Sequence, residues 1–323
     1  MSYSNNQSLT TYKKLAKKQK RLQFAEIEVL IMASLSVIYL AVFAYAPMFG
    51  VVLAFKDGNM KLNILDAILK SNWVGFNNFK IFLTDQNFKD VILNTLGLNV
   101  LMLFINFPAP IIFALLINEV WHAKFKKTIQ AITNFPHFIS WVVFGGICIA
   151  LTDMTTGIFN PLLKLIGLSS DENPINLQSS EFFWATIIIT SLIKGTGWGS
   201  IIYLASLSGI DPSLYEAAEI DGANRFHKAI YISIPMMADT ITIFLLLSIS
   251  NLLGNSFEHF YIFQNVLNIS RSEVLTTYIY KKGILQNMYS LSSAIGLFES
   301  TIGLILLVTA NYISKKTTGR SLY

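Results

Sequence analysis

The sequence predicts an all-α membrane protein with six transmembrane helices and both termini in the cytoplasm. Three observations support this prediction: long uncharged apolar runs, a low share of charged residues, and Lys/Arg clusters that recur on one side of the predicted membrane. Of the 323 residues, 53% are hydrophobic and only 13% are charged, with a mean hydropathy of +0.52. Soluble domains carry about a quarter charged residues, so the composition excludes a disordered chain and argues against an ordinary soluble enzyme.

The six predicted spans are apolar runs long enough to cross a bilayer as helices. About 20 helical residues, each rising about 1.5 Å, cross the ~30 Å hydrocarbon core. The first run is too long for the apolar part of a signal peptide and has no fitting cleavage site, so we expect it to be retained. Only Lys194 interrupts the fourth run, and only Glu299 the sixth. The runs cover residues 29–55, 91–118, 128–152, 182–210, 240–257 and 291–314.

The distribution of Lys and Arg predicts the orientation. Six spans place three basic segments on one side, and cytoplasmic segments of membrane proteins are enriched in these residues. The basic residues are Lys13, Lys14, Lys17, Lys18, Lys20 and Arg21 near the start, Lys124, Lys126 and Lys127 after the second span, and Lys315, Lys316 and Arg320 at the end. We therefore expect a basic cytoplasmic segment at 1–28, a six-span domain at 29–314 and a cytoplasmic tail at 315–323.

The polar loop at 209–239, between the fourth and fifth predicted spans, carries strong helix signals. Asp211 followed by Pro212 predicts a helix start, with Asp211 as the N-cap and Pro212 at the first helical position. Ser213 and Glu216 have the spacing of a capping box, so a start two residues later is also open.

Later in the same loop, Gly222 suits the left-handed position that ends a helix. A second short helix is expected over 224–232, and Pro235 is expected to end it before the fifth span. A rigid loop of this kind can dock into a cleft on another protein. The alternative is an amphipathic helix on the membrane surface, but this places the acids of the loop against an anionic leaflet.

These residues resemble a known motif, the EAA loop of ABC-importer permeases, which are the membrane subunits of binding-protein-dependent uptake systems. The matching residues are Glu216-Ala217-Ala218, Asp221-Gly222-Ala223 and Ile234-Pro235, with the Gly four positions after Ala218 and the Pro thirteen positions after the Gly. Four further segments resemble the carbohydrate branch of that family, and within it the permeases for complex oligosaccharides or polysaccharide fragments. They are 73–79, 198–205, 294–298 and 311–314.

The resemblance implies that the loop is a cytoplasmic coupling helix that sits in a groove of a separate ATP-binding subunit. Glu216 resembles a residue that pairs with a basic side chain there, while its role as a capping partner of Ser213 stays open. A buried ion pair of this kind specifies docking geometry more than it adds affinity. The implied ATPase-coupling residues are Tyr215, Glu216, Ala217, Ala218, Asp221, Gly222, Ala223 and Pro235.

The resemblance also implies the partners and the location of the chain. The partners are a second homologous permease subunit, a dimer of ATP-binding subunits and an extracellular solute-binding protein. MgATP is bound by the ATPase partner, and this chain itself is non-catalytic and holds no cofactor. Its cargo is a carbohydrate, an oligosaccharide in particular, and its place is the bacterial plasma membrane, which it crosses several times.

Polar side chains within spans are costly and are therefore functional candidates. The wider set is Asn94, Asn99, Asn106, Lys194, Asn251, Asn255, Glu258, His259 and Glu299. Sugars need hydrogen-bonding groups and flat aromatic faces, so the predicted substrate pathway adds two aromatic residues to part of that set. It comprises Asn99, Trp198, Tyr203, Asn251, Asn255, Glu258 and Glu299. The alternative is that these groups bond between helices or extend to the membrane surface.

Other functions find less support in the sequence. The basic N-terminus is a typical topogenic signal rather than a nucleic-acid site. The four histidines lack metal-ligand spacing, no Gly-rich phosphate loop occurs, and the single cysteine, Cys148, excludes an intrachain disulfide. Two alternatives stay open: the same machinery for a non-sugar solute, and an ion-coupled secondary transporter. The second would need coupling acids and usually an internal repeat, and only Glu299 is central.

Overall fold

The computed structural model describes residues 26–60, 63–170 and 174–322, and every regular element in these ranges is a helix. The only strand-type contact there is an isolated antiparallel bridge between Lys56 and Trp73. The chain divides into two compact units, Met1–Leu53 and Ala54–Tyr323. Most of the predicted basic segment at 1–28, and the last residue of the predicted tail, lie outside the described residues.

The first unit contains a long apolar helix, which is described over Glu26–Phe55 and ends just inside the second unit. It widens to a π-helical turn at Ala41–Tyr45, continues through α2 (Ala46–Met48) and tightens to a 3-10 helix at Phe49–Phe55. Pro47 follows the wide turn directly. Proline has no N–H and its ring crowds the carbonyl four residues earlier, so the π turn accommodates it without breaking the helix.

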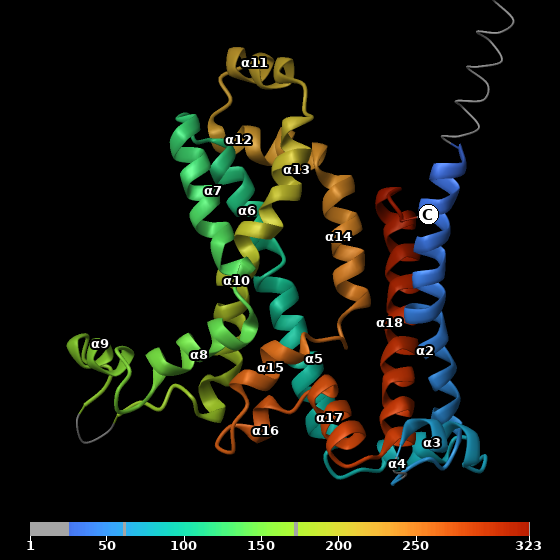
Figure 1. Cartoon of the computed structure of the whole chain (residues 1–323). Coiled ribbons are helices and arrows are strands. Elements are labelled where there is room, and N and C mark those ends of the chain that lie inside the picture. The colour runs from blue at the N-terminus through green and yellow to red at the C-terminus, as the bar shows by residue number, and fades with distance from the viewer. Residues whose placement is uncertain (1–25, 61–62, 171–173, 323) are drawn as a thin grey trace, which may run out of the picture. The chain divides into compact units, whose positions relative to one another are not determined.

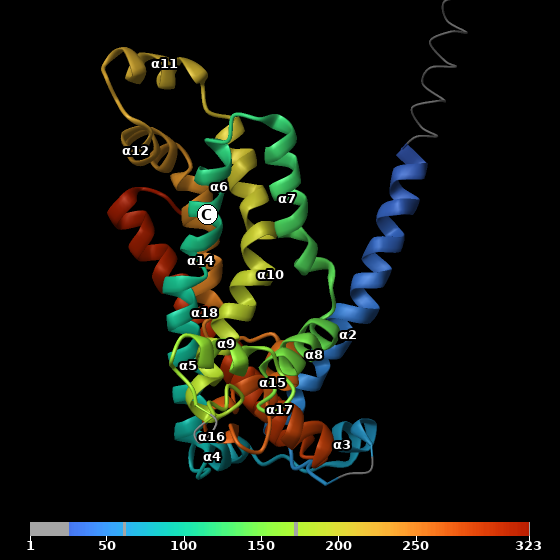
Figure 2. The same cartoon turned by 90° about the vertical axis from the view of Figure 1, so that its left-hand side faces the viewer.

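The second unit is built from helices of very different lengths (Figures 1 and 2). The long ones are α5 (Phe88–Ile105), α6 (Pro108–Asn118), α7 (Ala123–Phe138), α8 (Trp141–Thr152), α10 (Ser180–Ser208), α14 (Ala238–Ser250) and α18 (Tyr289–Thr318). The short ones are α3 (Ile64–Lys70), α4 (Asn77–Leu83), α9 (Phe159–Leu165), α11 (Pro212–Ile220), α12 (Arg225–Lys228), α13 (Ile234–Met236), α15 (Phe257–Phe263), α16 (Ile269–Ser272) and α17 (Leu275–Tyr280). In both views α11 and α12 lie at one end of this unit, and α3 and α4 lie at the other.

Four helices in the described ranges are long and apolar enough to span a bilayer: Glu26–Phe55, Phe88–Asn118, Ser180–Ser208 and Tyr289–Thr318. Two bent pairs, Ala123–Phe138 with Trp141–Thr152 and Arg225–Met236 with Ala238–Ser250, raise the number to as many as six if each pair is one span. The predicted all-α class with several apolar helices is therefore confirmed.

The third predicted run, 128–152, is bent and does not form one straight helix. The chain bends by 98° between α7 and α8. Ile139 and Ser140 have extended backbone angles, and the Ser140 hydroxyl accepts a hydrogen bond from the Val143 N–H at 3.3 Å, which starts a new helix. Pro136 removes a backbone donor just before the break. Hydropathy cannot detect this bend because both helices are apolar.

The fifth predicted run, 240–257, is too long, because α14 ends at Ser250 and a six-residue connection precedes α15. Pro235 also does not end the preceding helix as predicted. A π-helical turn at Ala229–Ser233 admits it, and the helix continues to Met236 before the chain bends by 67°. As at Pro47, the wider turn relieves the clash of the proline ring with an earlier carbonyl.

Three apolar clusters hold the second unit together. The first joins α4, α5, α17 and α18 around Phe82 and Leu291, and the second joins α5, α10 and α15 around Leu98 and Phe260. The third joins α6 and α10 with Met237 at the bend before α14. Helix α10 contacts α6 and α7 along its length, and α14 contacts α18.

Candidate functional site

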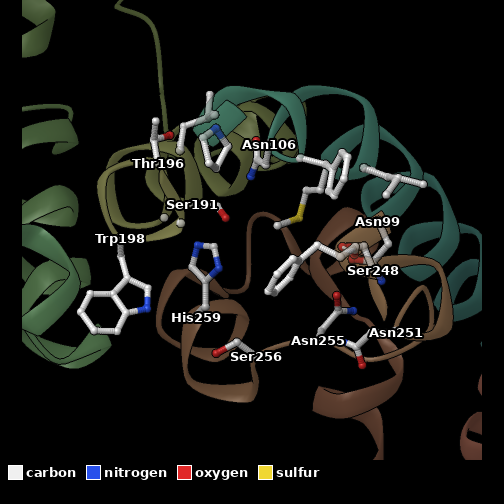
Figure 3. A pocket seen from close by; sticks show the side chains of 18 of the residues that line it. Asn99, Asn106, Ser191, Thr196, Trp198, Ser248, Asn251, Asn255, Ser256 and His259 are labelled. Atoms are coloured by element: carbon white, nitrogen blue, oxygen red, sulfur yellow. Dashed lines mark hydrogen bonds between the residues drawn. The ribbon is translucent and has the colours of Figure 1, made fainter. Parts of the chain in front are cut away.

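A cavity of about 580 Å³ lies between α5, α6, α10, α14 and α15, and its wall combines apolar side chains with amide and hydroxyl groups (Figure 3). Pro108 and Pro110 interrupt the α5–α6 helix because they cannot donate to earlier carbonyls, and the interruption turns Asn106 toward the cavity. The opposite wall is the connection between α14 and α15, with Asn251 and Asn255. None of the described residues that line the cavity is Asp, Glu, Lys or Arg.

The amide side chains of this cavity differ in whether they have partners. The Asn99 amide donates to the Leu252 carbonyl oxygen at 2.7 Å, so it links α5 to the connection after α14. By contrast, both side-chain polar atoms of Asn106 and the Nδ2 of Asn255 are buried without a hydrogen-bond partner within the described structure. An unpaired buried amide costs about 1–3 kcal/mol, so these two groups are suited to bind a polar ligand.

Two stacked ring pairs form the aromatic part of the wall. The Trp198 indole stacks on the His137 imidazole with centroids 4.4 Å apart and planes inclined by 3°. The Trp141 indole stacks on His259 at 3.7 Å, and His259 Nε2 lies 2.9 Å from the Thr190 hydroxyl. These contacts fix the rings at the cavity wall. Flat aromatic faces beside amide groups are the combination that a sugar ring requires, since it presents C–H faces and hydroxyl edges.

The structure brings five of the seven predicted pathway residues together at this cavity. Asn99, Trp198, Tyr203, Asn251 and Asn255 all line the cavity. Glu258 lines a neighbouring smaller cavity instead, and Glu299 lines neither. The sequence could not place them, because a charge within an apolar run has no visible direction.

Several lining residues were absent from the predicted pathway. Asn106 and His259 belonged only to the wider set of polar candidates, and Trp141, Ser191, Thr196, Ser248 and Ser256 were missed. The sequence does contain a pattern that could have indicated some of these lining residues. Ser191, Gly195 and Gly199 follow each other at four-residue spacing in α10, so they share one helix face, and small residues there leave room for a ligand.

Lys194 is a buried cation beside the cavity, only 6% exposed. Its ammonium donates to the carbonyl oxygen of Pro136 at 3.1 Å and to that of Ile139, and lies 4.6 Å from the centre of the Trp141 ring. Carbonyls at a helix C-terminus lack intrahelical partners and carry partial negative charge. Lys194 therefore stabilises the end of α7 at the 98° bend.

Replacing Lys194 with Met should lower the free energy of unfolding by on the order of 3 kcal/mol, since two charge-assisted hydrogen bonds are lost. Unfolding of the purified protein in detergent measures this. Lys127→Met, at an exposed position of α7, is the matched control and should change stability little. Equal stability of the two variants would contradict the role given to Lys194.

A second candidate site, apart from the cavity, is the helical loop that contains α11 and α12. Helix α11 begins at Pro212, and Asp211 accepts a hydrogen bond from the Ser213 N–H at 2.9 Å, so the start predicted at this pair is confirmed and the later start is wrong. Gly222 has φ of +79° and ends the helix. The Ala223 N–H donates to Ala218 O at 2.8 Å and the Gly222 N–H to Glu219 O at 3.0 Å, which is a Schellman motif.

Two polar contacts within the loop hold α11 against the segment that follows it. The Tyr215 hydroxyl lies 2.9 Å from the Ser233 hydroxyl, and Lys228 Nζ lies 2.6 Å from Glu219 Oε1. The outer surface is different, because Ile220 is 87% exposed and Phe226 71% exposed. Glu216 is also exposed and has no hydrogen bond or ion pair within the described ranges. An ordered loop with an unpaired acid and exposed apolar side chains is suited to bind another protein.

The Glu219–Lys228 contact gives the loop a pH dependence. The hydrogen bond from Lys228, then its charge, lowers the pKa of Glu219 from its ordinary value of 4.5. A lowered folded-state pKa stabilises the fold above the unfolded pKa, and that contribution is lost as pH falls through the folded value. Amides of α11 should therefore exchange hydrogen faster at pH 3 than at pH 7, after correction for intrinsic rates. Glu219→Gln should remove this difference, and identical protection in both proteins at both pH values would contradict it.

The chain matches the family described as "Binding-protein-dependent transport system inner membrane component" over residues 81–319. Protein LplB of Bacillus subtilis (strain 168) is 41% identical over 286 residues, which cover 88% of each chain. The polygalacturonan/rhamnogalacturonan transport system permease protein YteP of the same strain is 38% identical over 286 residues, which cover 88% of this chain and 87% of YteP.

Two solved structures are similar over nearly the whole chain. A chain of a bacterial ABC transporter involved in the import of the acidic polysaccharide alginate has a TM-score of 0.80 and 31% identity, with 93% of this chain and 99% of that chain covered. A chain of a bacterial alginate ABC transporter in complex with an alginate pentasaccharide-bound periplasmic protein has a TM-score of 0.81 and 30% identity, with 92% and 97% covered.

Proposed function

Because the chain belongs to the family of binding-protein-dependent transport system inner membrane components, a family of non-catalytic permease subunits, we propose that it forms half of the translocation pathway of an ATP-driven oligosaccharide importer. The observation that carries the cargo class is the main cavity, where unpartnered amides of Asn106 and Asn255 lie beside the fixed rings of Trp141 and Trp198. The names of the relatives, which include transporters of polygalacturonan and alginate, support the same class.

The proposed topology has six spans with both termini in the cytoplasm of a bacterial plasma membrane. Four spans are the long apolar helices, and each bent pair supplies one more. Residues 1–28 and 315–323 are then cytoplasmic, 29–314 is the six-span domain, and the loop at 209–239 also faces the cytoplasm. The excess of Lys and Arg in the segments assigned to the inner side supports this orientation.

The proposed role of α11 is to couple this chain to the ATPase. Glu216 and the exposed side chains of Ile220 and Phe226 are available to a partner, while the Schellman turn at Gly222 fixes the shape of the loop. Besides Glu216 and Gly222, the docking surface comprises Tyr215, Ala217, Ala218, Asp221, Ala223 and, at the base, Pro235. MgATP is bound on the ATPase dimer, and a second homologous permease and an extracellular solute-binding protein complete the importer.

Uptake into proteoliposomes tests this function. The chain is reconstituted with its cognate permease, ATPase and solute-binding protein, and labelled oligosaccharides are added outside with ATP trapped inside. We expect sugar accumulation that requires ATP and all four components. Accumulation of a peptide or polyol instead would overturn the cargo class. Accumulation by this chain alone, driven by an ion gradient, would overturn the importer itself.

A further inference from the structure

A second, smaller cavity of about 260 Å³ opens beside the first, between the α7–α8 bend, α10 and the start of α15. Trp141, Ser191 and Gly195 line both cavities, so the two adjoin. The side cavity differs from the main one in its charges, because Lys194 and Glu258 both line it. Its volume equals that of roughly nine water molecules at about 30 Å³ each, which is room for one sugar ring.

The charged groups of the side cavity are only partly satisfied. Lys194 has three N–H donors and uses two of them on the carbonyl oxygens of Pro136 and Ile139. Glu258 is exposed and makes no hydrogen bond or ion pair to any described residue. The third N–H of Lys194 has no hydrogen-bond acceptor among the described residues, although the ammonium lies 4.6 Å from the centre of the Trp141 ring and 5.4 Å from that of Phe144. This N–H and the Glu258 carboxylate are the charged groups that the cavity offers to a ligand.

The balance of charge indicates which ligand fits. The carbonyls at the C-terminus of α7 already offset part of the Lys194 charge, and Glu258 contributes a full negative charge. No surplus of positive charge is left for an anionic ligand, and an anion beside Glu258 would be repelled. Hydroxyl groups both donate and accept, so a neutral sugar ring can accept from Lys194 through one hydroxyl and donate to Glu258 through another.

We propose that the side cavity is a second sugar subsite of the same pathway, one that takes an uncharged ring and disfavours a uronic acid through Glu258. This inference rests on the proposed oligosaccharide transport. The carboxylates of an acidic oligosaccharide would then have to lie outside this cavity. Glu258 is a specificity-determining residue here, and Lys194 both binds the ring and maintains the bend.

The test compares matched cargo in the complete reconstituted transporter. The probes are trigalacturonate and its carboxyl-reduced form, which keep the same ring stereochemistry and differ in charge. ATP-dependent uptake of each is measured with the native chain, with Glu258→Gln, and with Glu181→Gln as the matched control. Glu181 is an exposed acid at the start of α10 that lines neither cavity. The same binding protein serves all three, so its own preference cancels in the comparison.

Glu258→Gln should lower the ratio of neutral to acidic uptake about tenfold, and Glu181→Gln should leave this ratio unchanged. An unchanged ratio in Glu258→Gln, with uptake intact in the native transporter, would overturn the subsite alone. A ratio that changes equally in both variants would also overturn it, because a bulk charge effect would then explain the preference. Failure of the native transporter to import either sugar would overturn the subsite together with the proposed oligosaccharide cargo.

Discussion

Gly222→Val should abolish ATP-dependent uptake and separate this chain from its ATPase, with a loss of at least tenfold in both. The residue has φ of +79°, and a Cβ built there meets no atom within 4 Å, so the strain is in the backbone alone. A left-handed conformation costs an L-residue about 1–2 kcal/mol, and a β-branched side chain tolerates it least. The turn would open, the Schellman hydrogen bonds would break, and α11 would lose its fixed orientation.

The experiment measures co-purification of the ATPase subunit together with ATP-dependent uptake in proteoliposomes. Gly222→Asn should retain part of both, since Asn adopts the left-handed region more readily than other residues. Gly319→Val is the matched control. That glycine has φ of +73° with no atom within 4 Å of a built Cβ, but it ends α18 outside the loop. Full coupling in Gly222→Val, or equal losses in both valine variants, would contradict a coupling role for the loop.

Asn106→Leu should lower sugar uptake at least tenfold while leaving the free energy of unfolding unchanged or higher. The two polar atoms of this side chain are buried without a partner in the described structure, so an apolar side chain of similar size removes a desolvation cost. The same change removes the hydrogen bonds offered to cargo, and a tenfold loss corresponds to about 1.4 kcal/mol. Opposite effects on uptake and stability separate a binding role from a structural one.

Asn99→Leu is the matched control, because it is the same substitution at another amide that lines the same cavity. Its amide donates to Leu252 O, so this variant should lose stability by about 1–3 kcal/mol. Uptake and unfolding are measured on both proteins in parallel. If Asn106→Leu destabilises the protein as much as Asn99→Leu, the Asn106 amide has a partner in the folded state and the cavity assignment is wrong. Uptake by Asn106→Leu at the native level would also contradict a role of Asn106 in cargo binding.

The apolar helices and the helical loop were predictable from the sequence because their causes are local. Uncharged runs of sufficient length predict membrane helices wherever they occur in the chain. The start of α11 depends on Asp211 and Pro212, and its end depends on the positive φ that Gly222 adopts. These preferences act within one or two turns, so neighbouring residues suffice to determine them.

The tertiary structure alone decided where those helices bend and which polar groups meet. The 98° bend between α7 and α8 is stabilised by Lys194, which lies 55 residues after Ile139 in the chain. Asn99 and Asn106 look alike in sequence, but a carbonyl oxygen from Leu252, 153 residues away, reaches only the first. Whether a buried amide stabilises the fold or remains free for a ligand depends on such distant partners, which no local pattern reveals. For the same reason Glu258 and Glu299, both predicted in the pathway, lie outside the main cavity.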